Sequence, residues 1–394
     1  MIMSTFLLLI IFVLYIGLGL PDSLFGAAWP AIFPDLGVSA GSGTLVTIPI
    51  FTCTFLSCAL AGKVINRFGT GTVVAVSTLL SCLALLGFSL SHSFILLIVF
   101  AIPLGFGAGS IDAAMNNYVA LHYKSYHMGF LHCFYGIGVL LSPILVSLSL
   151  SNDNDWRGGY MKVFILMAAL SVIAFASLPV WKKANKGFKK IEQTAEMRSL
   201  SFKSMLSCSA IRISWVMFFS TCALEFTCGV WGATYLVGAE GVLESTGALL
   251  VTLYYAGIVI GRLVSAILST KIKNMPIVFA GYSFVALAIV LMFLPLPATV
   301  KGVALFLVGF GNGPSFPNLI YLTPKIFGKD VSSSIVGTQM AAANLGILLV
   351  PPVFGLLADA AITFFPAFLL VLLAVMVYST VRYSILTKNQ VILP

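Results

Sequence analysis

Charged residues are scarce in this chain, and their scarcity excludes an ordinary water-soluble fold. Only 8% of the 394 residues are charged, whereas 60% are hydrophobic and the mean hydropathy is +1.08. Soluble domains carry about 25% charged residues, so the composition predicts an integral membrane protein. Twelve spans of roughly 20 to 24 residues would use about 240 to 290 residues. Little is left for a catalytic ectodomain, and we do not expect an enzyme.

Cysteine is also sparse, and none of the seven cysteines has the spacing of a metal site or of a CxxC redox pair. We therefore expect neither a metal nor a cofactor. The N-terminus lacks the basic start and the cleavage site of a secretory signal, so the first span is expected to be retained. The net charge of +9 lies mostly in loops, where it indicates membrane topology and contact with anionic lipid, not nucleic acid.

Apolar segments of span length occur twelve times along the chain. A break rich in Lys and Arg divides them into an N-terminal six-helix bundle (1–181), a basic cytoplasmic linker (182–205) and a C-terminal six-helix bundle (206–394). The twelve segments lie near residues 5–33, 43–63, 71–91, 94–121, 127–150, 160–181, 209–237, 246–270, 276–298, 302–323, 332–357 and 364–385.

Lys and Arg are distributed unevenly between the two sides of the expected bundle. On the side of the linker lie 17 of the 21 basic residues, Arg157, Lys162 and Lys301 lie opposite, and Arg262 lies within a span. Cytoplasmic loops are enriched in Lys and Arg, so we expect the linker and both termini to be cytoplasmic. The chain is then a multi-pass protein of a plasma or inner membrane.

Three motifs of the first half recur in the second half, in the same order and at nearly one offset. One chance match would be unremarkable in a glycine-rich apolar chain, but three at offsets of 203 to 208 indicate two parallel copies of a six-helix unit. The pairs are Asp22-x-x-x-Gly26-x-x-Trp29 with Glu225-x-x-x-Gly229-x-Trp231, Gly105-Phe-Gly-Ala-Gly109 with Gly309-Phe-Gly-Asn-Gly313, and Gly138-Val-Leu-Leu-Ser-Pro143 with Gly346-Ile-Leu-Leu-Val-Pro351.

Two parallel six-helix halves joined by a basic linker resemble the major facilitator superfamily. The segment Gly62-Lys-Val-Ile-Asn66-Arg67-Phe-Gly69 is similar to the family's G-x-x-x-D-R-x-G loop, with Asn66 where Asp is usual, and Asp155-Trp156-Arg157 is also similar. The resemblance implies a twelve-helix transporter that works by alternating access. It also implies that Asn66 and Arg67 belong to a cytoplasmic gate, which Asn66 holds more weakly because it lacks the charge.

Four charged residues lie at membrane depth, where each costs about 2.5 to 3.5 kcal/mol on insertion scales. They are Asp22, Asp112, Glu225 and Arg262. The acids recur in every third expected span, which favours a central aqueous cavity. The span at 302–323 has no acid but is broken by Pro314 and Pro317, so we expect freed carbonyls there, beside Asn318, to need water or substrate.

Several motifs sharpen the resemblance toward the fucose/proton symporter family of sugar transporters. Similar segments are Asp22-Ser-Leu-Phe, Gly109-Ser-Ile-Asp-Ala-Ala-Met-Asn116, Ile260-Gly-Arg262 and Asn344-Leu-Gly-Ile-Leu-Leu-Val-Pro351. The resemblance implies that Asp22 and Asp112 serve proton coupling and sugar binding. Tyr135 stands where that family has an Asn implicated in substrate recognition, so the identity of the sugar stays open.

The residues themselves suggest roles beside the resemblance. Asp112 and Asn116 are four apart on one helix face and could grip vicinal hydroxyls; alternatively Asp112 makes a structural bond between helices. Glu225 is a second candidate for solute contact, and a pair with Arg262 is its alternative. Arg262 itself is expected to be structural or gating. The remaining solute candidates are His132 as a proton relay, Tyr135 and Trp231 for stacking on a sugar, and the amides of Asn318 and Gln339.

We interpret the chain as a monomeric secondary transporter that carries a sugar or small polyol together with a proton. Sodium is the open alternative as coupling ion, because a carboxylate with backbone carbonyls also suits it. The alternative function is a proton-coupled exporter of drugs or other small solutes, which would use the same acids. A receptor or scaffold that transports nothing is disfavoured, because its buried acids would lack a purpose.

Overall fold

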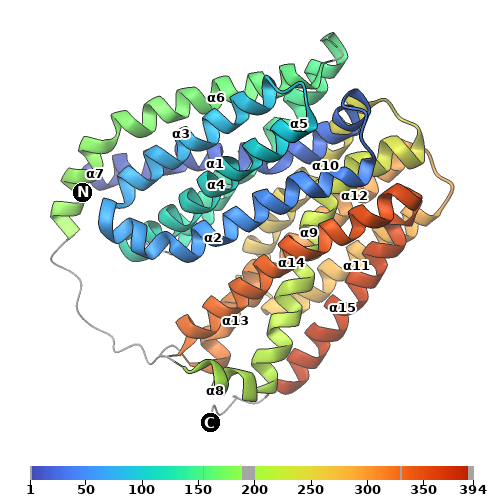
Figure 1. The fold of residues 1–394 in the computed structure, drawn as a ribbon. Coiled ribbons are helices and arrows are strands. Elements are labelled where there is room, and N and C mark those ends of the chain that lie inside the picture. Colours follow the sequence, from blue (N-terminus) through green and yellow to red (C-terminus); the bar gives the residue numbers. More distant parts are fainter. Residues whose placement is uncertain (1, 124, 154, 189–199, 329–330, 389–394) are drawn as a thin grey trace. The chain divides into compact units, whose positions relative to one another are not determined.

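The structure is a computed structural model that describes residues 2–123, 125–153, 155–188, 200–328 and 331–388 (Figure 1). These residues form helices and short connections without a strand, which confirms the expected all-α membrane fold. They contain eleven apolar segments long enough to cross a membrane. One of these, Ile335–Leu386, consists of two helices, so the eleven segments provide the twelve expected spans.

The chain divides into two compact units, Met1–Glu192 with Val242–Thr252, and Gln193–Gly241 with Leu253–Pro394. The domain boundaries expected from the sequence remain a prediction, because residues 189–199 of the linker lie outside the described part. The first half of the chain forms α1 Ile2–Asp35, η1 Ala40–Gly43, α2 Thr44–Phe68, α3 Thr70–Ser89, α4 Phe94–His122, α5 Ser125–Asp153, α6 Trp156–Ala176 and α7 Leu178–Phe188. The second half forms α8 Phe202–Ser207, α9 Ser209–Glu240, α10 Glu244–Leu268, α11 Asn274–Phe293, α12 Ala298–Asn312, α13 Ser315–Phe327, α14 Ser332–Ala361, η2 Ile362–Phe364 and α15 Phe365–Leu386.

The two units repeat the same helix pairings. In the first unit α1 packs mainly against α5, and α3 packs against α4 and α6. In the second unit α9 packs against α14, and α11 packs against α12 and α15. These pairs correspond one to one when the second half is aligned on the first, so the sequence repeat is also a structural repeat.

The glycines of the repeated motifs lie where two helices touch through their backbones. A Cβ atom on Gly138 of α5 would strike the Ile16 carbonyl of α1, and one on Gly346 of α14 would strike the Phe219 carbonyl of α9. Small residues at such positions let helices approach closely in a membrane. The other repeated motif behaves in the same way, with Gly105 against the Ile50 carbonyl and Gly309 against the Tyr254 carbonyl.

Large apolar side chains cover much of the accessible surface. Val172, Ile95 and Leu356 are 70%, 71% and 75% exposed, and exposed Leu, Ile, Val and Phe occur along most of the long helices. Monomeric soluble proteins rarely expose apolar patches of that extent, so this surface fits contact with lipid chains.

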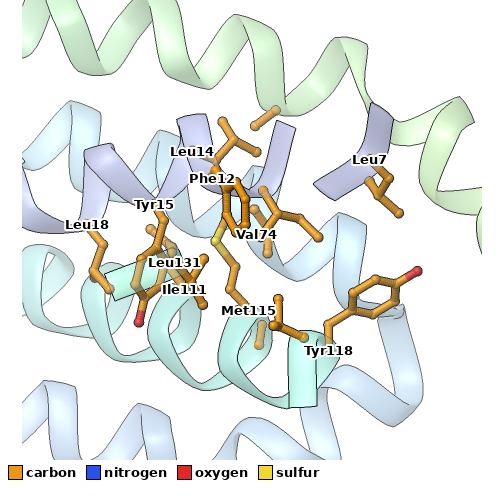
Figure 2. Close-up of a cluster of buried hydrophobic side chains, with 14 of the residues drawn as sticks. Leu7, Phe12, Leu14, Tyr15, Leu18, Val74, Ile111, Met115, Tyr118 and Leu131 are labelled. Carbon is orange, nitrogen blue, oxygen red and sulfur yellow. The ribbon is translucent and has the colours of Figure 1, made fainter. Parts of the chain in front are cut away.

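A buried apolar cluster holds α1 against its neighbours in the first unit (Figure 2). Figure 2 shows Phe12 and Leu18 of α1 on the side of Ile111 and Met115 of α4. The same cluster includes Tyr15, whose hydroxyl sits at the tip of a ring that points away from α1. The apolar packing therefore helps to hold the Tyr15 ring in place between α1 and α4.

The first helix of each unit ends in an acid that is tied to a basic residue. Asp35 accepts from Trp156 Nε1 at 3.1 Å and pairs with Arg157 Nη2 at 2.9 Å. Glu240 pairs with Lys301 Nζ at 2.9 Å and accepts from the Tyr235 hydroxyl at 3.1 Å. The two acids are 205 residues apart, within the range of the repeat offsets. Both units thus anchor the same helix end with different bases.

Replacement of Gly138 or Gly346 by Ala tests the close approach of these helices. Each methyl group would have to push two backbones apart, which costs about 1 to 3 kcal/mol of stability, so both variants should unfold several degrees below the wild type in detergent. Gly337→Ala is the matched control, because nothing lies within 4 Å of its added methyl group. Thermal unfolding that is the same for Gly138→Ala and Gly337→Ala would contradict this packing.

Candidate functional site

A tyrosine, an aspartate and an asparagine form a hydrogen-bonded group between α1 and α4. The Tyr15 hydroxyl donates to Asp112 Oδ1 at 2.6 Å. Asn116 Nδ2 approaches both the Tyr15 oxygen, at 2.8 Å, and Asp112 Oδ1, at 2.7 Å. The predicted pair of Asp112 and Asn116 on one face of α4 is therefore present, and Tyr15 is its third member.

Two oxygen atoms of the group receive no side-chain hydrogen bond from the described residues, and we call them open. All side-chain hydrogen bonds to the Asp112 carboxylate from described residues end on Oδ1, so Oδ2 accepts none of them. Asn116 uses its Nδ2 toward Tyr15 and Asp112, and its Oδ1 receives no hydrogen bond from the described residues. The site thus offers two acceptors, and Tyr15 and Asn116 fix the orientation of both.

A second carboxylate lies on the same helix as Tyr15. Asp22 is exposed, and its Oδ2 accepts a hydrogen bond of 2.8 Å from the Tyr135 hydroxyl of α5. The Tyr15 ring lies 5.8 Å from the His132 ring and 6.1 Å from the Tyr135 ring, measured between centroids. The structure thereby gathers the five candidates of the first half, Asp22, Asp112, Asn116, His132 and Tyr135, around Tyr15.

Close packing of α1 on α5 sets the positions of these side chains. A Cβ on Gly19 would strike the Tyr135 carbonyl, so α5 can approach α1 only because residue 19 is Gly. Ser142 donates to the Leu20 carbonyl at 2.6 Å, and Ser23 donates to the Val139 carbonyl at 2.7 Å. These contacts bracket Asp22 on α1 and keep Tyr135 within reach of its carboxylate.

Tyr15 is the residue of this group that the sequence analysis missed. A tyrosine in an apolar span is typical of a packed core, and Tyr15 is in fact only 1% exposed. The spacing between Tyr15 and Asp22 could have identified it. Tyr15 precedes Asp22 by seven residues, and two helical turns bring both residues to one face of the helix.

In the second unit, the deep acid is paired with the deep base. Arg262 Nη2 of α10 lies 3.0 Å from Glu225 Oε1 of α9, and both side chains are partly buried. Tyr254 donates to the Glu225 carbonyl at 2.7 Å. Of the two possibilities for Glu225, the pair with Arg262 is therefore formed in this structure, and contact of Glu225 with a solute remains a prediction.

The break between α12 and α13 differs in one respect from the expectation. The helix is interrupted at Gly313 and Pro314, as predicted. The Gly313 carbonyl accepts from Arg262 Nε at 3.4 Å, and the Pro314 carbonyl accepts from Asn318 Nδ2 at 2.6 Å. The expectation of a need for water or substrate is therefore wrong for these two carbonyls, because side chains of the protein reach them.

The other candidates of the second half are buried and bonded to protein groups. Asn318 also donates to Ser265 at 2.6 Å. Gln339 donates to Ser214 at 3.1 Å and accepts from Thr323 at 2.9 Å. The Trp231 indole donates to the Pro351 carbonyl at 2.8 Å. The structure shows no hydrogen bond from Asn318, Gln339 or Trp231 to Glu225, and their contact with a solute stays a prediction.

The gate candidates lie at the end of α2. Arg67 is exposed and stacks over the Phe68 ring at 5.4 Å, and Gly69 ends the helix with a φ of 80° that favours glycine. Asn66 lies within α2, but its side chain is outside the described part of the structure. The gating role of both residues remains a prediction.

The Glu225–Arg262 pair gives a test of its own. Glu225→Gln would leave Arg262 without its counter-ion and should lower stability by roughly 1 to 3 kcal/mol, less than for a fully buried pair because both groups keep some exposure. The double variant Glu225→Gln/Arg262→Gln removes both charges and should recover part of that loss in thermal unfolding. If the stability losses of Glu225→Gln and Arg262→Gln add up to the loss of the double variant, the pair contributes nothing to stability.

Comparison with known proteins gives a family match over most of the chain. A model of the Major Facilitator Superfamily matches residues 7–351. The protein named Bypass of stop codon protein 6, from Saccharomyces cerevisiae, is 23% identical over 382 residues, which cover 88% of this chain and 76% of the relative. The glucose/mannose transporter GlcP of Bacillus subtilis is 22% identical over 347 residues, which cover 82% of this chain and 84% of the relative.

A solved structure shares the whole fold. The crystal structure of a D-xylose-proton symporter matches with a TM-score of 0.74 over 96% of each chain, at 13% sequence identity. At this identity the likeness establishes the architecture and not the solute. It confirms the fold of two parallel six-helix halves that the sequence repeat predicted.

Proposed function

Because this chain belongs to the Major Facilitator Superfamily and is a multi-pass membrane transporter, we propose that it is a proton-coupled symporter of a neutral sugar or polyol. The observation that carries this proposal is the polar face of α1, α4 and α5. Asp112 and Asn116 present two open acceptors there, and the carboxylate of Asp22 lies on the same helix as Tyr15. Such a face suits a solute that brings hydrogen-bond donors.

Asp112 Oδ2 and Asn116 Oδ1 can each accept a hydrogen bond from a hydroxylated solute. Two neighbouring hydroxyls could each donate to one of them, and a solute lacking these hydroxyls would leave both acceptors without a bond from the solute. The partly exposed Tyr135 and the exposed His132, both beside the Tyr15 ring, add aromatic groups against which a sugar could pack. This arrangement supports a sugar or polyol over an apolar solute.

Charge argues against an anionic solute at this face. The sequences of α1, α4 and α5 contain two acids at membrane depth and no Lys or Arg. An anion would meet like charge without a counter-ion, and in the second unit Arg262 is already engaged by Glu225. A neutral solute avoids this cost.

Proton coupling follows from the same acids. Ionised Asp22 and Asp112 are costly to carry through a conformation closed to water, and protonation removes their charge so that the loaded carrier can reorient. Sodium is the competing coupling ion. The glucose/mannose transporter among the relatives supports a sugar, and export of amphipathic drugs is the alternative that the same acids would allow.

The cytoplasmic side is assigned from charge. Most Lys and Arg lie on the side of the linker and both termini, so we place these segments in the cytoplasm of a cell membrane. Each unit contains buried hydrophobic residues of its own, and we propose that the transporter works as a monomer in the bilayer.

Uptake into proteoliposomes with an imposed pH gradient tests the function directly. The wild type should accumulate at least one of D-glucose, D-mannose, D-xylose and mannitol in the absence of sodium. A protonophore should abolish this accumulation. Succinate and ethidium, as an anion and an amphipathic cation, should not accumulate. Asp22→Asn should abolish accumulation and leave exchange of preloaded solute partly intact, because the fixed neutral amide no longer binds the coupled proton. Accumulation by Asp22→Asn at the wild-type level would remove Asp22 from the coupling.

Binding of the transported sugar to purified Asp112 variants tests the solute site. Asp112→Ala should abolish binding in calorimetry, because unpaired solute hydroxyls cost roughly 1 to 3 kcal/mol each. Asn116→Ala should weaken binding less, since the carboxylate remains.

Monodispersity in detergent is the control for these variants, because Asp112 also joins α4 to α1. Monodisperse Asp112→Ala protein that binds the sugar with unchanged affinity would move the site elsewhere. Glu225 with Trp231 would then be the next region to examine.

A further inference from the structure

Tyr15 does more in this structure than complete a polar group. Its hydroxyl donates to Asp112 Oδ1 at 2.6 Å and receives Asn116 Nδ2 at 2.8 Å, so both hydrogen bonds join α1 to α4. Elsewhere α1 packs mainly against α5 and α6 and touches α4 much less. The polar link through Tyr15 thus joins α1 to α4 beside the apolar cluster that these helices share.

The strength of this link depends on the charge of Asp112. A phenol donates a stronger hydrogen bond to an ionised carboxylate than to a neutral carboxyl group. The open oxygen of Asp112, Oδ2, is where a proton can add without displacing Tyr15 or Asn116 from Oδ1. Protonation at Oδ2 would leave Oδ1 a carbonyl-like acceptor, and the bond from Tyr15 would weaken while its partners stay in place.

Few other titratable groups face this position. On α1 the next is Asp22, and on α5 they are His132 and Tyr135. From α2, Cys58 donates its thiol to the Gly109 carbonyl at 3.2 Å. The α3 sequence, TGTVVAVSTLLSCLALLGFS, carries no charged residue. Asp112 is the member of this set to which the Tyr15 hydroxyl donates its hydrogen bond.

We propose that Tyr15 is a positioning residue that transmits the protonation state of Asp112 to α1. With Asp112 ionised, the phenol ties α1 to α4; with Asp112 protonated, the tie weakens and α1 is released for the movement that follows loading. This inference rests on the proposed proton coupling and adds the residue through which the proton acts on the helix.

Hydrogen–deuterium exchange of the purified full-length protein tests the inference without any solute. The probe is the proton itself, with exchange measured at two pH values and corrected for the intrinsic effect of pH. In the wild type, peptides that contain Tyr15 should exchange about tenfold faster at the lower pH, where a charge-assisted hydrogen bond becomes a neutral one. Peptides from α6 serve as the internal reference.

Three variants assign the response. Tyr15→Phe should exchange fast in α1 at both pH values, and Asp112→Asn should do the same because its amide mimics the protonated acid. Tyr118→Phe removes a phenol hydroxyl from α4, where Tyr118 packs on His122 and Trp181, and should keep the wild-type response. A wild type without a pH response in α1, or a Tyr15→Phe variant that responds as the wild type does, would overturn the inference. If Tyr15→Phe is not monodisperse, Asp112→Asn takes its place. A pH response of α1 in Asp112→Asn equal to that of the wild type would then overturn the inference.

The uptake assay separates this inference from the proposed function. Failure of the wild type to accumulate any sugar or polyol in a pH gradient would end the proposed function. Coupled uptake by Tyr15→Phe with the wild-type pH profile would end only the role of Tyr15. A Tyr15→Phe variant that exchanges solute but has lost the pH profile supports both, whereas a purely structural tyrosine would lower all rates and leave the profile unchanged.

Discussion

A carboxylate at membrane depth must be bonded, paired or exposed to water, and this constraint organises both units. In the first unit, the Tyr15 phenol and the Asn116 amide donate hydrogen bonds to Asp112. Asp22 accepts a hydrogen bond from the Tyr135 phenol and is exposed. The second unit meets the constraint for Glu225 with Arg262. Among the described residues, the first solution contains no Lys or Arg partner for the acids, and the second is an ion pair without net charge.

The repeat explains why the two solutions can differ on one scaffold. Gly138 and Gly346 occupy equivalent positions and allow the same close approach to the first helix of each unit. These backbone contacts fix the helices and leave the polar face free to diverge. In the second unit Arg262 connects the Glu225 carboxylate to the break at Gly313. In the proposed function, the solute and the proton bind to residues of the first unit.

Sequence reasoning succeeded where periodicity or composition carries the information. The spans, the repeat and the shared face of Asp112 and Asn116 all follow from spacing along one helix. It failed where a contact joins residues far apart in the chain, since nothing local links Tyr15 to Asp112, 97 residues away. The partners of the carbonyls at Gly313 and Pro314 were missed for a related reason. A broken helix predicts free carbonyls, but which side chain reaches them depends on tertiary packing.

The central claim is that a solute and a proton cross together through the polar face of the first unit. The most direct test is the pH outside proteoliposomes when a transported sugar is added without an imposed gradient. The external medium should become alkaline as the sugar enters, and Asp22→Asn protein should give no alkalinisation. Entry of the sugar into wild-type proteoliposomes without any change in external pH would contradict it.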